Sequence, residues 1–190
     1  MGELNLQHFD CIMVDIETTG LRPDRHAIIQ IAAVPFSVDR QEISESYFDM
    51  CLRIPSTRGW QETTRDWWHG TNLPLLKEIL GRAQPAQHVM QCFRNFLSEL
   101  APKTRFWGKR SFDWQFIESY FHDTEVGNPL SYKNAIEVES FMQGLAFPNP
   151  MPNVRPEFEG IPHHAYWDTK HQIRTLFAII NELKGGNNAT

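Results

Sequence analysis

A short apolar run that ends in two acidic residues constrains this chain of 190 residues more than any other stretch. Residues 11–14 read Cys-Ile-Met-Val, and residues 15–20 read Asp-Ile-Glu-Thr-Thr-Gly. The run predicts a buried strand, and side chains two residues apart on a strand point to the same face. Asp15 and Glu17 are therefore expected to project together at the edge of a hydrophobic core.

Two carboxylates held side by side repel each other, and burial makes the charged pair costlier still. A divalent cation resolves this conflict, and oxygen ligands favour Mg²⁺ or Mn²⁺ over a zinc ion held by sulfur. The alternative that this stretch alone leaves open is a strand end whose acids face solvent or cap the following turn.

The length of the chain suits one domain, which we expect over residues 1–184, followed by a flexible C-terminal tail over residues 185–190. Hydrophobic residues make up 41% of the chain and charged residues 22%, which is enough for a full core. The net charge of -5 argues against a protein that coats duplex DNA non-specifically, because such proteins are basic. An enzyme that contacts a few phosphates through metals and local cations is compatible with this charge.

The cysteines indicate a reducing environment. Cys11, Cys51 and Cys92 are scattered, odd in number and without a metal-binding spacing, which is typical of free thiols. No cationic and apolar signal segment is visible at the N-terminus, and no run is long enough for a membrane-spanning helix. We therefore expect a cytoplasmic protein with no membrane contact.

The hydrophobic pattern predicts strands first and helices later, which is an α/β arrangement. Strands are expected over residues 11–18, 27–38 and 47–54 as an antiparallel meander, with a further short strand over residues 105–108. Helices are expected from Thr63, over residues 73–80 and 88–100, from Asp113, and over residues 136–145 and 164–183. Residues 147–162 contain five prolines and are expected to form a loop.

Three further residues could carry chemistry, and each has an ordinary explanation when taken alone. Asp113 follows a predicted strand, where an aspartate is most often a helix N-cap. Asp168 lies in the last predicted helix, where solvated acids are common. His163 stands at the exit of the proline-rich loop, and its neighbour His164 would lie one helical turn before Asp168.

Together these residues form three motifs in a characteristic order. An Asp-x-Glu-Thr motif occupies residues 15–18, a Phe-Asp pair residues 112–113, and a His-x-Ala-x-x-Asp motif residues 163–168. This pattern resembles the DEDDh 3′–5′ exonucleases, an RNase H-like group that includes RNase T, oligoribonuclease and the proofreading epsilon subunit. Trp-Gly at residues 107–108 and the tryptophan pair at residues 67–68 are similar to the branch of phage DNA exonuclease A and mycobacterial RNase AS.

The resemblance implies an RNase H-like mixed sheet of about five strands flanked by helices. It also implies a 3′–5′ exonuclease that releases nucleoside 5′-monophosphates from single-stranded RNA or DNA, with a homodimer among the expected assemblies. Four carboxylates, Asp15, Glu17, Asp113 and Asp168, would hold two divalent ions, Mg²⁺ or Mn²⁺. Two such ions about 3.5–4 Å apart neutralise the phosphate and promote attack by water.

A histidine completes the expected site. The family spacing selects His163 over His164 as the general base, and the unperturbed pKa of histidine side chains in general, about 6.5, suits proton transfer at neutral pH. Its place on a proline-rich loop suggests that it moves toward the site when substrate binds.

Six residues are expected to contact the substrate: Thr18, Leu21, Trp67, Trp68, Lys109 and Arg110. The resemblance implies that Thr18 and Leu21 line the pocket for the terminal nucleotide. Adjacent residues on a helix face different ways, so we expect one tryptophan in the core and one stacked on a base. Lys109 and Arg110 lie in the region where much of the family has an asparagine, and their side chains would contact phosphates.

Two other functions stay open at this point. A nucleic-acid-binding module that kept the fold and lost the chemistry is disfavoured by the presence of all four carboxylates and the histidine. A phosphodiesterase for dinucleotides or other small esters would use the same residues. The choice between RNA and DNA has no sequence signature here, because one or two polar contacts are enough to recognise a 2′-hydroxyl.

Overall fold

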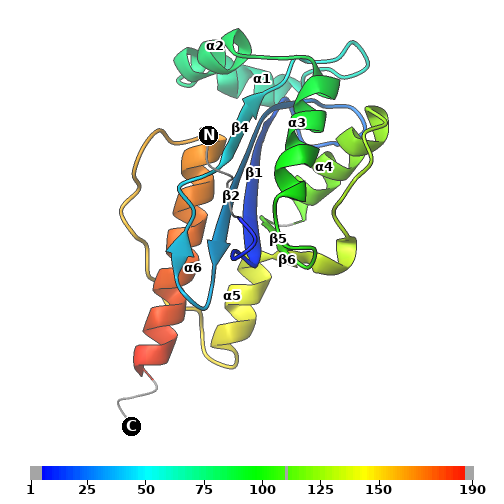
Figure 1. Ribbon diagram of the computed structural model, residues 1–190. Coiled ribbons are helices and arrows are strands. Elements are labelled where there is room, and N and C mark those ends of the chain that lie inside the picture. The colour runs from blue at the N-terminus through cyan, green and yellow to red at the C-terminus, as the bar shows by residue number, and fades with distance from the viewer. Residues whose placement is uncertain (1–5, 110, 187–190) are drawn as a thin grey trace.

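The computed structural model describes residues 6–109 and 111–186, and a mixed sheet forms its centre with helices against both faces (Figure 1). The sheet contains six strands: β1 (Cys11–Thr18), β2 (Ile28–Ser37), β3 (Glu42–Ile43), β4 (Phe48–Cys51), β5 (Arg105–Gly108) and β6 (Ala135–Glu137). Their order is β3-β2-β1-β5-β6, and β4 also pairs with β2. The predicted α/β fold with an RNase H-like mixed sheet is confirmed, with one strand more than expected.

Six α-helices surround this sheet: α1 (Glu62–His69), α2 (Leu73–Gly81), α3 (Ala86–Ser98), α4 (Phe112–Asp123), α5 (Val138–Ala146) and α6 (Ala165–Gly186). A single 3-10 turn, η1 (Tyr132–Asn134), precedes β6. Helices α3 and α4 lie against one face of the sheet, and α5 and α6 against the other (Figure 1).

The central strand β1 divides its side chains between the two cores. Ile12, Val14 and Ile16 pack in the core that α3 and α4 cover, whereas Cys11 and Met13 pack in the core under α5 and α6. This alternation is the ordinary period of a strand. The next odd-numbered residues of β1 are the two acids, so the pleat that builds the core also directs them toward α6.

The pairing of β1 leaves one side of its C-terminal half open. It pairs antiparallel with β2 along its whole length, but it pairs parallel with β5 only over its first three residues. Because β1 and β5 run in the same direction, the segment after β5 leaves the sheet next to the end of β1. That segment leads directly into α4.

The helix expected over residues 88–100 lies two residues earlier, at Ala86–Ser98, and two other predicted helices differ from the structure at one end for a clear physical reason. The helix expected over residues 136–145 begins later, because Ile136 pairs with Trp107 in the sheet and Glu137 caps α5 instead. The Glu137 carboxylate accepts hydrogen bonds from the N–H groups of Glu139 and Ser140 at 3.1 and 2.6 Å. The tertiary pairing of β6 with β5 therefore decides where the helix starts.

The last helix continues through two residues that were expected to belong to the tail. Gly185 and Gly186 form the end of α6, and residues 187–190 lie outside the described part of the chain. Glycine lowers helix propensity by about 1 kcal/mol, which weakens a helix without forbidding it. The helix already packs on the sheet through Ile173, Leu176 and Ile180.

The cysteines behave as expected, since all three are free and Cys11 and Cys51 are buried. Burial raises the pKa of both buried thiols to about 11, which keeps them protonated and unreactive. Among the helices of the described residues, none is both long enough and apolar enough to cross a bilayer.

The core under α3 depends on Phe93, which is fully buried against Phe48 and Phe121 with ring centroids 5.0 and 6.0 Å away. We expect Phe93→Ala to lower the free energy of unfolding by about 3–5 kcal/mol, because it removes a buried ring and leaves a cavity. The control Tyr132→Ala removes a side chain that is 70% exposed and should cost only about 0.5 kcal/mol. Urea denaturation measures both values, and equal losses would contradict this view of the core.

Candidate active site

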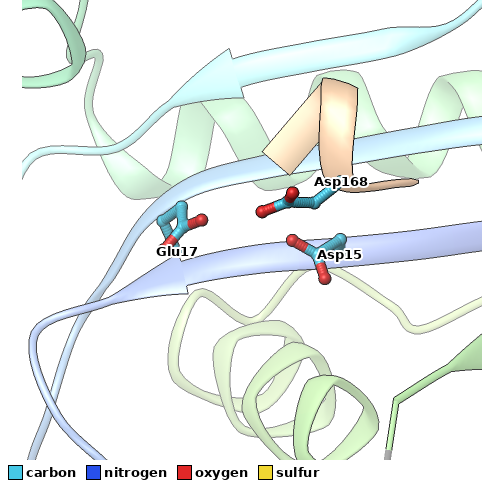
Figure 2. A group of neighbouring side chains, drawn as sticks. All are labelled: Asp15, Glu17 and Asp168. Carbon is cyan, nitrogen blue, oxygen red and sulfur yellow. The ribbon is translucent and has the colours of Figure 1, made fainter. Parts of the chain in front are cut away.

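Three carboxylates from two distant parts of the chain point toward one another (Figure 2). Asp15 and Glu17 extend from β1, and Asp168 extends from the first turn of α6. One oxygen of each lies within 4.8 Å of the others, and all three residues are partly buried. Among the described residues, no lysine or arginine forms an ion pair with any of them.

The fourth predicted acid, Asp113, is placed behind this group by the parallel pairing of β1 and β5. Its side chain is 3% exposed, and its Oδ2 accepts a hydrogen bond from the Lys109 N–H at 2.7 Å. The interpretation as a helix N-cap is wrong, because Asp113 is the second residue of α4 and Ser111 occupies the cap position. A buried acid that is not required for capping is free for another role.

The electrostatics of the four acids favour the uncharged forms while no cation is present. Burial is the largest cause in each case, and it raises the pKa of Asp15 and Glu17 well above their usual range. The charges of neighbouring acids raise both further. The pKa of Asp113 rises to about 7 through burial, although the Lys109 N–H opposes the shift. Burial also raises the pKa of Asp168.

This donor set fits hard divalent cations. It offers only carboxylate oxygens, and among the described residues only the charge of Lys109, which forms no ion pair with Asp15, Glu17 or Asp168, lowers the pKa of Asp15 from a distance. Carboxylate oxygens are the preferred protein ligands of Mg²⁺ and Mn²⁺. We call Asp15, Glu17, Asp113 and Asp168 the acidic cluster. Asp15 and Glu17 therefore belong to this cluster and do not form a solvated strand end.

The two adjacent histidines lie in different environments. His163 is exposed, has a left-handed backbone with φ 62°, and packs its ring edge-on against Trp67 with centroids 4.8 Å apart. His164 is only 6% exposed, and its Nε2 lies 3.1 Å from the Gln30 Nε2. Gln30 also accepts a hydrogen bond from the Ala165 N–H at 3.2 Å, so His164 belongs to a buried network at the start of α6.

The tryptophan pair divides between core and surface. Trp68 is 1% exposed and donates a hydrogen bond from Nε1 to the Thr18 carbonyl at 3.1 Å. Trp67 is 42% exposed and contacts His163. A fully buried indole has no face to offer a base, so the expectation that Trp68 contacts substrate is wrong, and it supports the strand end instead. Trp67 stays a predicted contact.

The turn after β1 places the two other predicted pocket residues next to Glu17. The Thr18 hydroxyl is buried and donates to the Gly20 carbonyl at 2.9 Å, and Leu21 is 66% exposed. A Cβ on Gly20 would lie 2.6 Å from the His26 ring, so only glycine fits this turn. Lys109 reaches to within 4.0 Å of Glu139 with its Nζ, and Arg110 lies outside the described residues.

The structure adds one residue to the site, Gln172, that the sequence analysis did not identify. Gln172 donates a hydrogen bond from Nε2 to the Asp15 Oδ1 at 2.7 Å. It lies one helical turn after Asp168, and residues four apart share a face of a helix. The helical spacing from Asp168 was the one signal that would have identified it.

The fold and the acidic cluster together define an exonuclease-like protein. The structure superimposes on Escherichia coli Exonuclease I in complex with a dA13 oligonucleotide with a TM-score of 0.67 and 16% identity, over 90% of this chain and 40% of that one. It also matches the nuclease domain of 3′hExo, a DEDDh family member bound to rAMP, with a TM-score of 0.68 and 19% identity over 92% and 94% of the chains. Both likenesses show the RNase H-like exonuclease fold.

Sequence comparison assigns the family. Residues 10–180 match the model of the 3′-5′ exoribonuclease Rv2179c-like domain, and the chain belongs to this family of 3′–5′ exonucleases. It is also 26% identical over 191 residues to the 3′-5′ DNA exonuclease Cap18 of Escherichia coli, which covers 90% of this chain and 91% of that protein. The resemblance to the DEDDh exonucleases that the three motifs indicated is thereby confirmed.

Without a divalent cation, the stability of the protein should fall as pH rises from 5 to 8. Between the ordinary value of 3.8 and the folded-state pKa of about 7, folded Asp113 binds more protons than the unfolded chain, so the free energy of unfolding decreases with pH. Thermal unfolding in a chelator measures this slope, and Asp113→Asn should reduce it. Asp66→Asn, at an exposed acid, is the matched control, and an unchanged slope in Asp113→Asn would contradict the assignment.

Proposed function

We propose that this protein is a metal-dependent 3′–5′ exonuclease that hydrolyses the last phosphodiester bond of single-stranded RNA or DNA and releases nucleoside 5′-monophosphates. One observation carries the proposal: two motifs from distant parts of a 3′–5′ exonuclease family member bring Asp15, Glu17 and Asp168 within 4.8 Å. Such a cluster of unpaired acids is unfavourable in a stable protein unless a ligand uses it.

Four residues would hold two divalent cations, Mg²⁺ or Mn²⁺: Asp15, Glu17, Asp113 and Asp168. When bound, such cations neutralise phosphate charge and favour ionisation of water near neutral pH. Asp15 is the central ligand in this proposal, because Gln172 orients its carboxylate from one side and the charges of Asp113 and Asp168 both act on it.

His163 is the proposed general base, which takes a proton from the attacking water. It is exposed beside Trp67, and a hydrogen bond from its backbone lowers the pKa of Asp168, so it lies next to the acidic cluster. His164 is buried against Gln30 and is assigned a structural role. A ring at the surface of a loop can approach a bound substrate, whereas a ring within the buried network cannot do so without unpacking the start of α6.

The terminal nucleotide is placed at the Thr18 end of the site in this proposal. Leu21 and Trp67 are exposed there and offer apolar surface for a sugar and a base. Stacking on an aromatic ring requires an unpaired base and is worth about 1–3 kcal/mol per base. The net charge of -5 also favours a short contact with a single strand over a long contact with duplex.

An activity assay distinguishes an RNA substrate, with ribose, from a DNA substrate, with deoxyribose. The family model carries the description of an exoribonuclease, whereas the relative Cap18 is a DNA exonuclease. The assay therefore compares labelled single-stranded RNA and DNA of one sequence, each with Mg²⁺ and with Mn²⁺. Release of 5′-monophosphates from the 3′ end of either strand supports the proposal. Cleavage of neither strand, together with hydrolysis of a dinucleotide, would replace it with the small-ester alternative.

Asp15→Asn should abolish hydrolysis while the protein stays folded. The substitution keeps the shape of the side chain but removes the charge that binds cations, and we expect kcat to fall by about 10³-fold or more. Asp66→Asn, on the exposed face of α1, should keep full activity. If Asp15→Asn retained normal cleavage, the cluster would not be the catalytic site.

His163→Ala should lower kcat by about 10²–10⁴-fold with little change in stability, as expected when a general base is lost. His164→Ala should instead lower the free energy of unfolding by about 1–3 kcal/mol, because it removes a buried partner of Gln30. Steady-state kinetics and urea denaturation on both variants separate the two roles. Loss of activity in His164→Ala alone would reverse the assignment.

A further inference from the structure

Gln30 is a polar residue in the middle of an apolar strand. Residues 28–36 of β2 are apolar apart from this glutamine, which is fully buried. A buried amide destabilises a fold unless it forms hydrogen bonds, whereas an aliphatic side chain would fill the same space without needing any. The hydrogen-bond partners of Gln30 therefore indicate what the amide contributes.

The sheet places Gln30 beside the acidic cluster. In the antiparallel pairing of β1 with β2, Gln30 lies directly opposite Glu17. Residues that face each other in this way point to the same side of a sheet, with Cβ atoms about 4.5–5.5 Å apart. The Gln30 side chain therefore extends to the face of the sheet that carries the strand acids and the start of α6.

The Gln30 amide binds the backbone at the first residue of α6. Its Oε1 accepts a hydrogen bond from the Ala165 N–H at 3.2 Å. The first N–H groups of a helix have no partner within the helix, so they need one from outside it. Gln30 supplies this partner from a position 135 residues earlier in the chain.

Two further contacts hold the amide in one orientation. Its Nε2 donates to the Asp49 Oδ1 at 2.7 Å and lies 3.1 Å from the His164 Nε2. The Asp49 carboxylate is paired with Arg82 at 2.9 Å. Because a carboxylate only accepts hydrogen bonds, a rotated amide would place its oxygen against Asp49 and its NH₂ group against the Ala165 N–H. The amide can therefore serve as a fixed support.

This support lies between the two functional residues of the last motif. The His164 carbonyl accepts a hydrogen bond from the Asp168 N–H at 3.1 Å. A hydrogen bond from the backbone of His163 to the Asp168 carboxylate lowers the pKa of that carboxyl. Because Gln30 contacts His164 and Ala165, a shift of the first turn of α6 would move His163 and Asp168 together.

We propose that Gln30 is a positioning residue of the active site: from β2 it fixes the first turn of α6 and thereby aligns His163 and Asp168 with the two acids of β1. Gln30 acts through the helix and is itself neither a cation ligand nor a base. This inference rests on the proposed exonuclease function and adds a residue that lies outside the three motifs.

Gln30→Met tests the proposal, because it keeps the length of the side chain and removes the amide. We expect kcat on a single-stranded oligonucleotide to fall about 10–100-fold and the Kd for Mn²⁺ to rise about tenfold, as when partners that orient metal ligands are lost. Calorimetry without substrate measures the Mn²⁺ affinity. KM should stay nearly unchanged, because Gln30 is not part of the proposed nucleotide pocket.

The matched control is Met90→Ala, which weakens the core on the opposite face of the sheet, where Met90 is fully buried. It should lower the stability without changing kcat or the Kd for Mn²⁺. Both variants are measured at a temperature at which circular dichroism shows them to be folded. If Gln30→Met changed either quantity no more than Met90→Ala does, Gln30 would have a structural role only and the positioning proposal would be overturned.

A second pair of variants exchanges donor and acceptor. Gln30→Glu keeps an acceptor for the Ala165 N–H but sets a carboxylate against Asp49, so it should lower kcat. Adding Asp49→Asn supplies an N–H donor between the two side chains and should restore most of kcat, and no recovery would contradict the proposal. Failure of the unmodified protein to cleave any oligonucleotide would overturn the exonuclease function itself, whereas the Mn²⁺ affinities would still decide whether Gln30 positions Asp168.

Discussion

The repulsion among buried carboxylates is the constraint on which the functional part of this structure depends. Asp15 and Glu17 cannot separate, because β1 is fixed by β2 along its length and its neighbouring side chains lie in two cores. Asp168 cannot withdraw, because α6 packs on the sheet. The packing of the whole domain thus holds acidic side chains together that would otherwise move apart, and a divalent cation would turn this unfavourable arrangement into a binding site.

The alternation of side chains along β1 builds both the hydrophobic cores and the acidic cluster. Even-numbered residues of β1 fill the core under α3 and α4, and odd-numbered residues fill the core under α6 until the two acids replace them. A slip of one residue in the pairing of β1 would exchange these sets and bury the acids in the wrong core. The antiparallel register with β2 therefore maintains the geometry of the acidic cluster as well as the stability of the fold.

Residues that make no direct contact with the expected substrate organise the rest of the site. Trp68 supports the strand end through the Thr18 carbonyl, and Gln172 orients Asp15. The backbone N–H of Lys109 holds Asp113 in a position that a helix cap would not have required. These supports come from α1, α6 and the end of β5, which surround the acidic cluster from three directions.

The sequence by itself determined the α/β class, the positions of the long strands and helices, the family resemblance and the set of four acids with a nearby histidine. It could do so because hydrophobic periodicity and motif spacing are local properties of the chain. Tertiary structure alone decided that residues 135–137 form a strand, that His164 and Trp68 are buried, and that Gln172 reaches Asp15. These outcomes depend on which segments meet in space, and the physical partners lie up to 157 residues apart.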